Sequence, residues 1–324
     1  MDEAISGIHH ITAIAGAPRP NVDFYCGLLG LRLVKKTVNF DDTGTYHLYY
    51  GDELGRPGTI LTFFPYPNAV PGRAGKAMAV ATAYSIKERS LEFWMERFAD
   101  EGHSFDLDDR FGQRLLGFDD PDGLRLELIA NDDLTAIDGD VSVEDDGPGP
   151  REHALRGFHS CTIALADPRQ TLRLLTNTFG WTEVGEENGR VRVRAAPAPH
   201  GALVDLVRSE ERGRGGAGTI HHIAFRARGD EEQLRWRETL LSMGFDVTDV
   251  QDRFYFHSIY FREPGGVLFE IATDGPGFTR DEDRALLGTG LKLPPWLQAQ
   301  RPQIEKRLVE LAAPPRARAW RRRA

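Results

Sequence analysis

The chain has 324 residues, enough for about two domains, and its 40% hydrophobic and 27% charged residues describe an ordinary globular protein. Its net charge of −9 argues against nucleic acid as a partner, and no segment approaches the roughly eighteen apolar residues of a membrane span. The first residues lack a signal-peptide pattern, and two cysteines are too few for a disulfide framework. We therefore expect a cytoplasmic protein.

Four segments of the chain share one pattern: a short β-rich run, a helix, a glycine just past its end, and further strands. Each predicted helix carries apolar residues at three- and four-residue spacing. Glycine readily adopts the left-handed backbone that often ends a helix. The helices are predicted at 21–29, 88–99, 168–178 and 230–243, and the glycines are Gly30, Gly102, Gly180 and Gly244. We predict four βαβββ modules in an α+β fold.

The spacing within these modules agrees closely. Gly30 follows His10 by 20 residues, as Gly180 follows Ser160. The second and fourth modules match at a constant offset of 143 residues, from the Asp-Arg-Phe motif to the final glutamate. This constant offset aligns Glu127 with Glu270. Chance does not explain so regular a match between the two segments.

We predict that the modules form two barrel-like domains. Modules one and two occupy residues 1–135, and modules three and four occupy 157–275. An acidic segment rich in glycine and proline, 136–156, is the predicted linker. Residues 276–324 form a C-terminal extension with a predicted helix at about 303–312 and a basic, solvated tail at 316–323.

A His-His pair occurs twice, as His9-His10 in module one and His221-His222 in module four. Adjacent strand residues face opposite ways, so only one histidine of each pair should line a cavity. Module three has a histidine, His159, at the first position of the pair but serine at the second. A histidine at the first position therefore occurs where no metal site is expected, so its role does not require a metal. This favours His10 and His222 as metal ligands, with His9 and His221 facing away or supporting the ligands through the adjacent backbone.

The metal-capable positions decide which modules should pair. Module two has Thr82 at the second-histidine position. If modules one and two shared a barrel, each barrel would hold only one such histidine. If modules one and four pair around the metal, His10, His222 and Glu270 converge. The corresponding late-strand positions of the other modules are Thr62 or Phe63, Glu127 and Asp205. We therefore predict that modules one and four pair.

Two histidines and one carboxylate leave coordination positions open, as in non-haem Fe(II) oxygenases. Mn(II) would suit the same ligands, whereas Zn(II) by itself would indicate hydrolytic or Lewis-acid chemistry. A single strand histidine is more often a core residue than a ligand, but two registered pairs with an aligned glutamate favour a metal site. His47 alternates with apolar residues and could approach the cavity, although a ligand role is not favoured.

These motifs resemble the vicinal oxygen chelate superfamily, which includes glyoxalases, bleomycin resistance proteins and extradiol dioxygenases. Within it, the chain is most similar to hydroquinone ring-cleaving dioxygenases, over nearly its whole length. The motifs are Gly7-Ile-His-His-Ile-Thr, Asp23-Phe-Tyr, the segments 28–38 and 46–59, Arg110-Phe-Gly-Gln-Arg, Arg156-Gly-Phe-His-Ser, Ile220-His-His and Pro264-Gly-Gly-Val-Leu-Phe-Glu.

The resemblance implies Fe(II) held by His10, His222 and Glu270, with an aromatic substrate and O₂ as partners. It also implies that Arg253 and Tyr260 face the substrate, and that His9, Thr12 and His221 support the pocket. The segment 252–260 is shorter here than in the chlorohydroquinone enzymes and carries His257. The substrate therefore stays open at this point, and the protein could form a homo-oligomer.

Tyr260 is a candidate acid or base, since a phenol beside a metal cavity can exchange a proton. Arg253 could hold developing negative charge. The alternatives are strand packing for Tyr260 and an ion pair for Arg253, because Arg110 has the same register in module two. Two rival functions remain: a glyoxalase-like isomerase or transferase, which usually needs a second carboxylate, and a non-catalytic protein that binds aromatic compounds or drugs.

Overall fold

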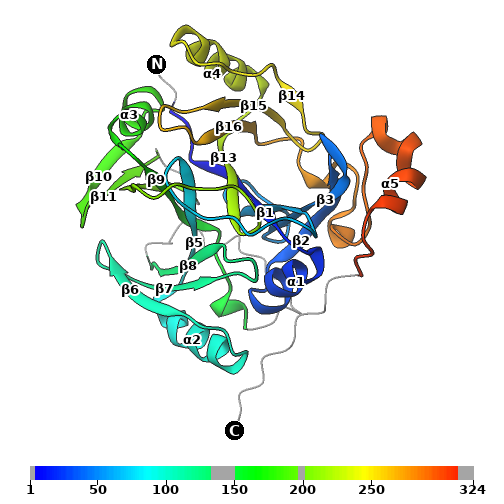
Figure 1. Cartoon of the computed structure of the whole chain (residues 1–324), viewed down its shortest axis with the longest axis horizontal. Helices are drawn as coiled ribbons and strands as arrows, with labels where there is room; N and C mark the ends of the chain where they lie inside the picture. The colour runs from blue at the N-terminus through cyan, green and yellow to red at the C-terminus, as the bar shows by residue number, and fades with distance from the viewer. Residues whose placement is uncertain (1–3, 133–149, 196–200, 313–324) are drawn as a thin grey trace.

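The computed structural model describes residues 4–132, 150–195 and 201–312. It consists of two curled eight-stranded sheets that lie side by side, with the module helices on their outer faces (Figure 1). Every module runs β-α-β-β-β, so the predicted α+β fold of four repeated modules is confirmed. Apolar side chains from all four modules form one continuous core cluster.

The first sheet contains modules one and four, in the order β14-β15-β16-β13-β1-β4-β3-β2. Module one comprises β1 (Ile8–Ala15), α1 (Pro18–Val22), the π-helix η1 (Asp23–Leu28), β2 (Arg32–Asn39), β3 (Asp42–Gly51) and β4 (Ile60–Pro65). Module four comprises β13 (Thr219–Ala227), α4 (Asp230–Ser242), β14 (Gln251–Asp252), β15 (His257–Arg262) and β16 (Leu268–Thr273).

The second sheet contains modules two and three, in the order β10-β11-β12-β9-β5-β8-β7-β6. Module two comprises β5 (Met78–Ile86), the 3₁₀ turn η2 (Glu88–Ser90), α2 (Leu91–Asp100), β6 (Asp106–Arg110), β7 (Gln113–Asp119) and β8 (Arg125–Ala130). Module three comprises β9 (Phe158–Leu165), α3 (Arg169–Arg173), the π-helix η4 (Leu174–Thr178), β10 (Thr182–Glu187), β11 (Arg190–Arg194) and β12 (Leu203–Arg208), and the 3₁₀ turn η3 (Arg151–His153) precedes it.

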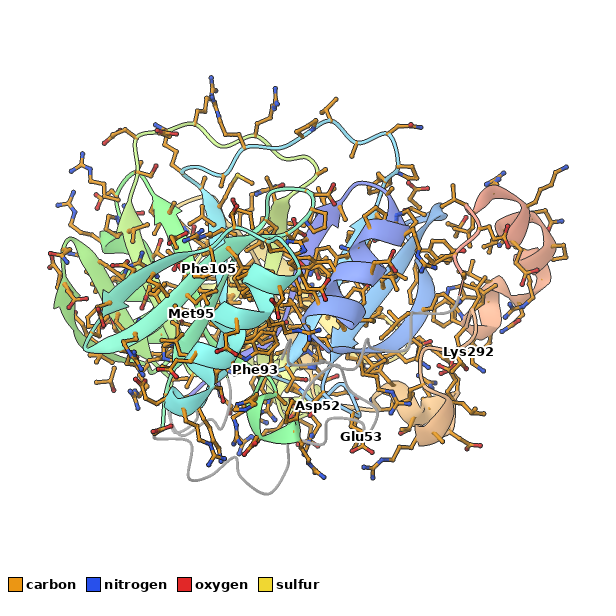
Figure 2. The ribbon with its side chains drawn as sticks, turned by 90° about the horizontal axis from the view of Figure 1, so that it is seen from below. Asp52, Glu53, Phe93, Met95, Phe105 and Lys292 are labelled. Atoms are coloured by element: carbon orange, nitrogen blue, oxygen red, sulfur yellow. The ribbon has the colours of Figure 1, made fainter. Side chains whose placement is uncertain are left out.

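The helices form where their apolar spacing predicts. On α2, Phe93 is buried, and Met95 and the following Phe105 are partly buried against the same core (Figure 2). The four glycines that follow the helices have φ angles of 72°, 73°, 76° and 86°, the left-handed values expected of helix-ending glycines.

The pairing at the centre of each sheet confirms which modules associate. β1 pairs antiparallel with β13, and β5 pairs antiparallel with β9. In all four modules the last strand lies parallel to the first. Each sheet thus combines one module from each side of the predicted linker. Most of that linker lies outside the described residues, and the domain boundaries remain a prediction.

Both central pairings are interrupted by β-bulges, each of which leaves one residue without an opposite partner. In the first sheet the extra residues are His9 and His221, and in the second sheet they are Val80 and His159.

By this register Ala81, not Thr82, occupies the position of His222 in module two. The prediction of Thr82 is wrong by one residue because it counted back from the helix, and the two modules differ in the length of that stretch.

The C-terminal extension packs beside β2 and β3 (Figure 1). It contains η5 (Phe278–Arg280), η6 (Arg284–Leu286), η7 (Pro295–Gln300) and α5 (Arg301–Arg307). The last helix ends earlier than predicted, because Leu308 is extended and the chain turns Leu311 into the core. Glu53, marked in Figure 2, accepts a hydrogen bond of 2.8 Å from Arg284 of the extension. The predicted basic tail lies outside the described residues.

None of the helices in the described part of the chain is long and apolar enough to cross a membrane.

Candidate metal centre

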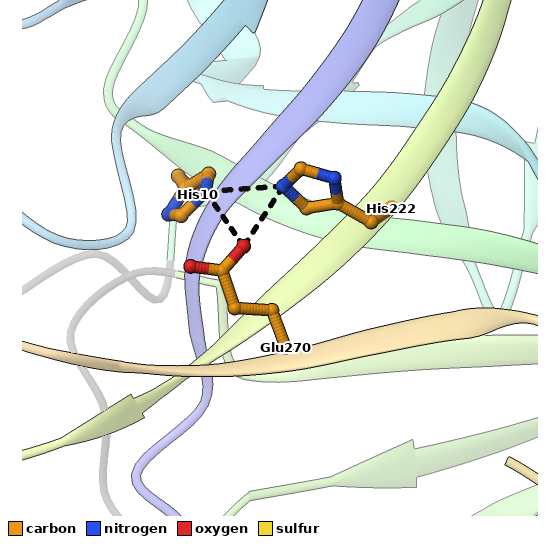
Figure 3. A group of neighbouring side chains, drawn as sticks. All are labelled: His10, His222 and Glu270. Carbon is orange, nitrogen blue, oxygen red and sulfur yellow. Dashed lines mark hydrogen bonds and ion pairs between the residues drawn. The ribbon is translucent and has the colours of Figure 1, made fainter. Parts of the chain in front are cut away.

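Three side chains on the central strands of the first sheet point toward one another (Figure 3). Nε2 of His222 lies 2.9 Å from Oε2 of Glu270 and 3.4 Å from Nε2 of His10. Nε2 of His10 lies 3.4 Å from the same carboxylate oxygen. β1, β13 and β16 each supply one of the three residues. The structure therefore brings together the three predicted ligands from opposite ends of the chain.

The spacing of these atoms suits a shared metal ion. Ligand atoms about 2.1 Å from one ion and roughly at right angles lie about 3 Å apart. The carboxylate oxygen Oε2 of Glu270 is buried and accepts no hydrogen bond from the described residues, although two imidazole nitrogens lie nearby. An unsatisfied buried carboxylate oxygen is costly, and a cation at the meeting point would satisfy it.

Burial and charge prepare the ligands for a cation. Burial alone would raise the pKa of Glu270, but the facing imidazoles of His10 and His222 hold that pKa well below its usual range. Burial lowers the pKa of His222, which favours the neutral ring that a metal requires. The site therefore offers one carboxylate and neutral imidazole in an enclosed setting.

The first histidine of each pair supports the second. Nδ1 of His9 lies 2.9 Å from Nδ1 of His10, and Nδ1 of His221 lies 2.8 Å from Nδ1 of His222. These contacts occupy Nδ1 of each ligand ring and leave Nε2 to face the centre, as partners of metal-bound histidines do. His9 and His221 thus contact the neighbouring histidines through their rings, whereas the two predicted alternatives were that they face away or act through the adjacent backbone.

Strict alternation describes the first pair, of which only His10 lines the cavity, but not the second. His221 and His222 both line the cavity beside the centre, whereas alternation would place only one there. The reason is the bulge: His9 and His221 are the extra residues in their strands. A bulge locally kinks the strand and redirects its side chains, so that two adjacent rings can meet.

Thr62 occupies the position that carries a carboxylate in the other three modules. In module one, Thr62 on the last strand lies opposite Thr12 on the first strand. In module four, Glu270 lies opposite Ala224 in the same way. The hydroxyl oxygens of Thr62 and Thr12 lie 2.9 Å apart. The equivalent residues elsewhere are Glu127 and Asp205. Thr62 rather than Phe63 is therefore the counterpart, and the fourth position of the centre is uncharged.

A hydrogen-bonded row continues from Thr62 across the sheet. Nε2 of His47 lies 2.8 Å from the hydroxyl of Thr62, and its Nδ1 lies 2.8 Å from the hydroxyl of Tyr49. Both His47 and Tyr49 line the cavity. His47 therefore reaches the cavity wall, as its alternation suggested, but stands outside the group of three ligands. Thr12 is fully buried beneath this wall.

A cavity of about 400 Å³ opens beside the centre. Its wall is largely aromatic, and two polar groups from the predicted set, Arg253 and Tyr260, face it. The lining residues include Ile14, Phe40, Phe64, Tyr66, Phe256 and Leu268. A cavity of this size and composition suits a small aromatic molecule.

Arg253 and Tyr260 are linked. Nε of Arg253 donates to the hydroxyl of Tyr260 over 3.1 Å, and Nη1 pairs with Asp41 at 3.0 Å. Burial and the nearby Glu270 raise the pKa of Tyr260, so its phenol stays protonated at neutral pH. Burial alone would lower the pKa of Arg253, but Tyr260 and Asp41 raise it. The two residues present a phenolic donor and a fixed positive charge.

Two residues that contact the predicted ligands were not predicted from the sequence. Ser258 donates a short hydrogen bond to Oε1 of Glu270, which fixes the carboxylate. The ring of Phe256 packs on His9 and His10, with centroid distances of 5.2 and 5.1 Å. The alternation of β15 could have indicated Ser258, which shares a face with Tyr260, whereas no sequence signal placed Phe256 on the histidines.

The second sheet holds no such group of ligands among the described residues. There, Arg110 forms two hydrogen bonds with Glu127, of 2.7 and 2.9 Å. Arg192 likewise binds both oxygens of Asp205, at 2.7 and 2.8 Å. Guanidinium groups thus neutralise the carboxylates that match Glu270. Arg110, the counterpart of Arg253 in module two, therefore forms an ion pair, and Glu127 is its partner.

The two curled sheets and the converging histidines and carboxylate define a metal-dependent enzyme class built from paired βαβββ modules. The chain belongs to the Glyoxalase/Bleomycin resistance protein/Dioxygenase superfamily, which matches residues 7–128 and 157–271. This agrees with the resemblance noted in the motifs.

Similarity to individual proteins indicates a more specific class of enzyme within this superfamily. The chain is 45% identical to MhqO of Bacillus subtilis, whose name describes a ring-cleaving dioxygenase, over 95% of this chain and 97% of that protein. It is 34% identical to chlorohydroquinone/hydroquinone 1,2-dioxygenase of Sphingobium indicum, over 94% and 96% of the two chains. A crystal structure described as a dioxygenase from Bacillus subtilis shares 44% identity, with a TM-score of 0.89 over 95% of this chain and 98% of that one. The protein is therefore an enzyme of the oxygenase type.

Proposed function

We propose that this protein is a non-haem Fe(II)-dependent dioxygenase that opens a hydroquinone-type ring with O₂, a catechol-type ring being the related alternative. The observation that carries the proposal is the group of His10, His222 and Glu270 beside an aromatic cavity, with uncharged Thr62 in the fourth position. Three protein ligands leave positions for both a substrate oxygen and O₂. Mn(II) would fit the same donors.

Iron bound there would lower the pKa of a coordinated hydroxyl and carry electrons between ring and O₂. The three ligands hold the ion, and the first histidine of each pair fixes the ring of the second. Ser258 holds the carboxylate oxygen that faces away from the centre. These contacts keep the ligands in place without further rearrangement.

Two cavity residues act on the substrate in this proposal. Tyr260 keeps its proton at neutral pH and can donate it to an oxygen of the opening ring. Arg253 binds the Tyr260 hydroxyl and so fixes the direction in which the phenol donates. Its fixed positive charge would stabilise negative charge developing on the substrate. His9 and His221 fix the rings of the ligands, His221 also lines the cavity, and Thr12 contacts the hydroxyl of Thr62.

The aromatic wall orients the ring and keeps water away. Phe256 closes the side next to His10, and Phe64 lies across the cavity near His221, with ring centroids 6.0 Å apart. Stacked and edge-on aromatic contacts prefer a flat ring in a defined plane. The substrate would therefore enter with one hydroxyl toward the ligands.

Two rival functions fit less well. A glyoxalase-like isomerase or transferase usually needs a second carboxylate, and Thr62 stands at that position. A non-catalytic protein that binds aromatic compounds or drugs would not need the three converging ligands or the paired histidines that hold them. These two observations favour ring cleavage.

The test is anaerobic purification, reconstitution with Fe(II), and measurement of O₂ uptake with a panel of hydroquinones and catechols. We expect uptake with at least one hydroquinone, and loss of both metal and uptake in His222→Ala. His257→Ala is the matched control, because His257 lies on the same module but binds Asp230 at the start of α4. No uptake with any ring, together with unchanged metal content in His222→Ala, would contradict the proposal.

We also propose that the chain is organised as halves 1–135 and 157–275 around the linker 136–156, followed by the extension 276–324. The cytoplasmic location and the possible homo-oligomer stay predictions. Limited proteolysis that cuts within 136–156 before any other segment would support the boundaries.

A further inference from the structure

The hairpin turn between β2 and β3 forms part of the rim of the cavity. Asn39, Phe40 and Asp41 all line the cavity. The amide of Asn39 donates to the hydroxyl of Tyr66 over 3.4 Å, and the ring of Phe40 packs edge-on against Trp296 with centroids 5.8 Å apart. The rim is therefore held from two sides.

Within this turn, Asp41 meets the positive side chain of the cavity. Its carboxylate lies 3.0 Å from Nη1 of Arg253, and its backbone N–H donates to Oδ1 of Asn39 over 3.0 Å. The Asp41 side chain is 70% exposed and that of Arg253 is 20% exposed. Asp41 thus stands at the mouth and Arg253 further inside.

The guanidinium of Arg253 is engaged in both directions. Nε binds the Tyr260 hydroxyl toward the interior, and Nη1 binds Asp41 toward the solvent. Among the described residues that line the cavity, Arg253 is the one arginine and there is no lysine. A ring with an anionic substituent would need this group as its counter-ion and would have to displace Asp41 to reach it. The rest of the wall is mainly apolar and offers such a substituent little compensation.

We propose that Asp41 is a specificity-determining residue that occupies Arg253 and excludes aromatic rings bearing a carboxylate. The proposal rests on the proposed function, because it assumes that the cavity binds an aromatic substrate. Rings with neutral substituents are admitted, because they need no counter-ion and bury their apolar surface against the aromatic wall. In the free enzyme, Asp41 also keeps the guanidinium directed toward the phenol.

The test compares two probes that differ in one charge, 3-hydroxybenzoate and 3-hydroxybenzamide. The carboxylate of the first lies too far from its hydroxyl for both to bind one metal ion. Binding of each probe to the Fe(II)-loaded protein is measured by calorimetry without O₂, so that the readout does not depend on turnover. We expect wild type to prefer the amide and Asp41→Asn to shift the affinity ratio toward the benzoate by up to about fivefold, the size expected for one exposed charge.

Three variants control this result. Asp42→Asn removes the same charge one residue further along, from a side chain that binds its own turn, and should leave the ratio unchanged. Asp41→Glu keeps the charge and should keep the preference for the amide. In Asp41→Asn combined with Arg253→Gln, the gain in benzoate binding should disappear, because the freed guanidinium is gone.

An unchanged ratio in Asp41→Asn, or equal shifts in Asp41→Asn and Asp42→Asn, would overturn the proposal. A shift confined to Asp41→Asn supports it even if no ring is ever cleaved, which separates this test from that of the proposed function. Loss of O₂ uptake with an unchanged pattern of probe binding would count against the proposed function alone.

Discussion

At the residue scale, the centre depends on two bulged histidines. His9 and His221 are the extra residues in their strands, and each turns its Nδ1 onto the neighbouring ligand. A β-bulge is a small disruption of the ladder, yet here it sets the orientation of both imidazoles. The same bulge recurs at His159 in the second sheet, where arginine and carboxylate pairs replace the ligands.

Thr62 gives the first prediction at this scale. Thr62→Asp places a carboxylate where module three has Asp205. Thr62 is fully buried within reach of Thr12 and His47, so the new carboxylate would be a fourth ligand and would fill an open position at the ion. We expect slower loss of metal to a chelator and a fall in O₂ uptake of about tenfold or more, because fewer positions remain for substrate and O₂.

Metal release and O₂ uptake should be measured on the same preparation, with Thr62→Ser as the control. Thr62→Ser keeps the hydroxyl and should behave nearly as wild type. Unchanged uptake in Thr62→Asp, with metal held more tightly, would show that the fourth position is not needed for the reaction.

The sequence was sufficient to predict which three side chains converge, but not their surroundings. His10, His222 and Glu270 follow from repeat register alone, since each has a counterpart in another module. The bulges could not be predicted, because they appear only when two strands distant in the chain are paired. For the same reason counting from the helix misplaced Thr82, and Asp41 could not be assigned to Arg253 across more than two hundred residues.

At the element scale, the C-terminal extension is fixed to the first sheet by a buried lysine. Lys35 on β2 is fully buried, and its ammonium lies 2.7 Å from Asp281 and also contacts Glu282. The same ammonium lies 4.9 Å from the ring centroid of Tyr255. The helix at 303–312 was predicted too long, because sequence alone did not show that Leu311 would return to the core.

Lys35→Met should destabilise the protein strongly. The change leaves two acidic groups without their main partner, and breaking a buried ion pair costs about 3–5 kcal/mol. We expect a lower urea midpoint and faster proteolysis in the extension. Lys292→Met is the control, because Lys292 lies 3.9 Å from Glu282 and is one-third exposed, so its loss should cost less than about 1 kcal/mol. Equal effects of the two changes would contradict the assigned role of Lys35.

A second prediction concerns the junction between η1 and the turn that joins β7 to β8. Asp120 there accepts a hydrogen bond from the Tyr25 hydroxyl, and burial raises the pKa of Asp120 to about 6. A raised carboxyl pKa means that the folded state binds the proton more tightly than the unfolded state. Stability from this group is full below about pH 3.8, falls as pH rises to about 6, and is then constant.

Asp120→Asn should remove the fall in folding stability that wild type shows as pH rises. Relative to wild type, the variant should gain stability between about pH 4 and about pH 7, by at most about 3 kcal/mol for a shift of about two pKa units. Denaturant unfolding of the metal-free protein at several pH values measures the difference. A constant difference across that range would show that Asp120 does not titrate as its burial implies.

At the scale of the whole molecule, each sheet requires both halves of the chain. The predicted pairing of modules one and four is confirmed by the β1–β13 ladder, and it follows from the need to bring two histidines to one ion. What sequence could not provide is how the two sheets share a continuous core, because such packing depends on side chains from all four modules.

Separating the halves tests this arrangement. A fragment of residues 1–132 has β1 and β5 without their central partners and lacks two of the three ligands. We expect it to bind no metal and to unfold without cooperativity, and we expect co-expression with 150–324 to restore one bound ion. Metal analysis and urea unfolding measure both. Cooperative unfolding and metal binding by the first fragment alone would contradict the shared-sheet architecture.

The β1–β13 pairing also sets an order for events on the ribosome. β1 is synthesised before the other strands of the two sheets, but its central partner begins only at Thr219. β5 and β9 can pair earlier, so the second sheet can form while one edge of β1 is still unpaired. A long wait with an exposed strand edge favours aggregation. The two ligands that complete the centre emerge late, and a newborn chain cannot hold the ion until nearly all four modules have been made.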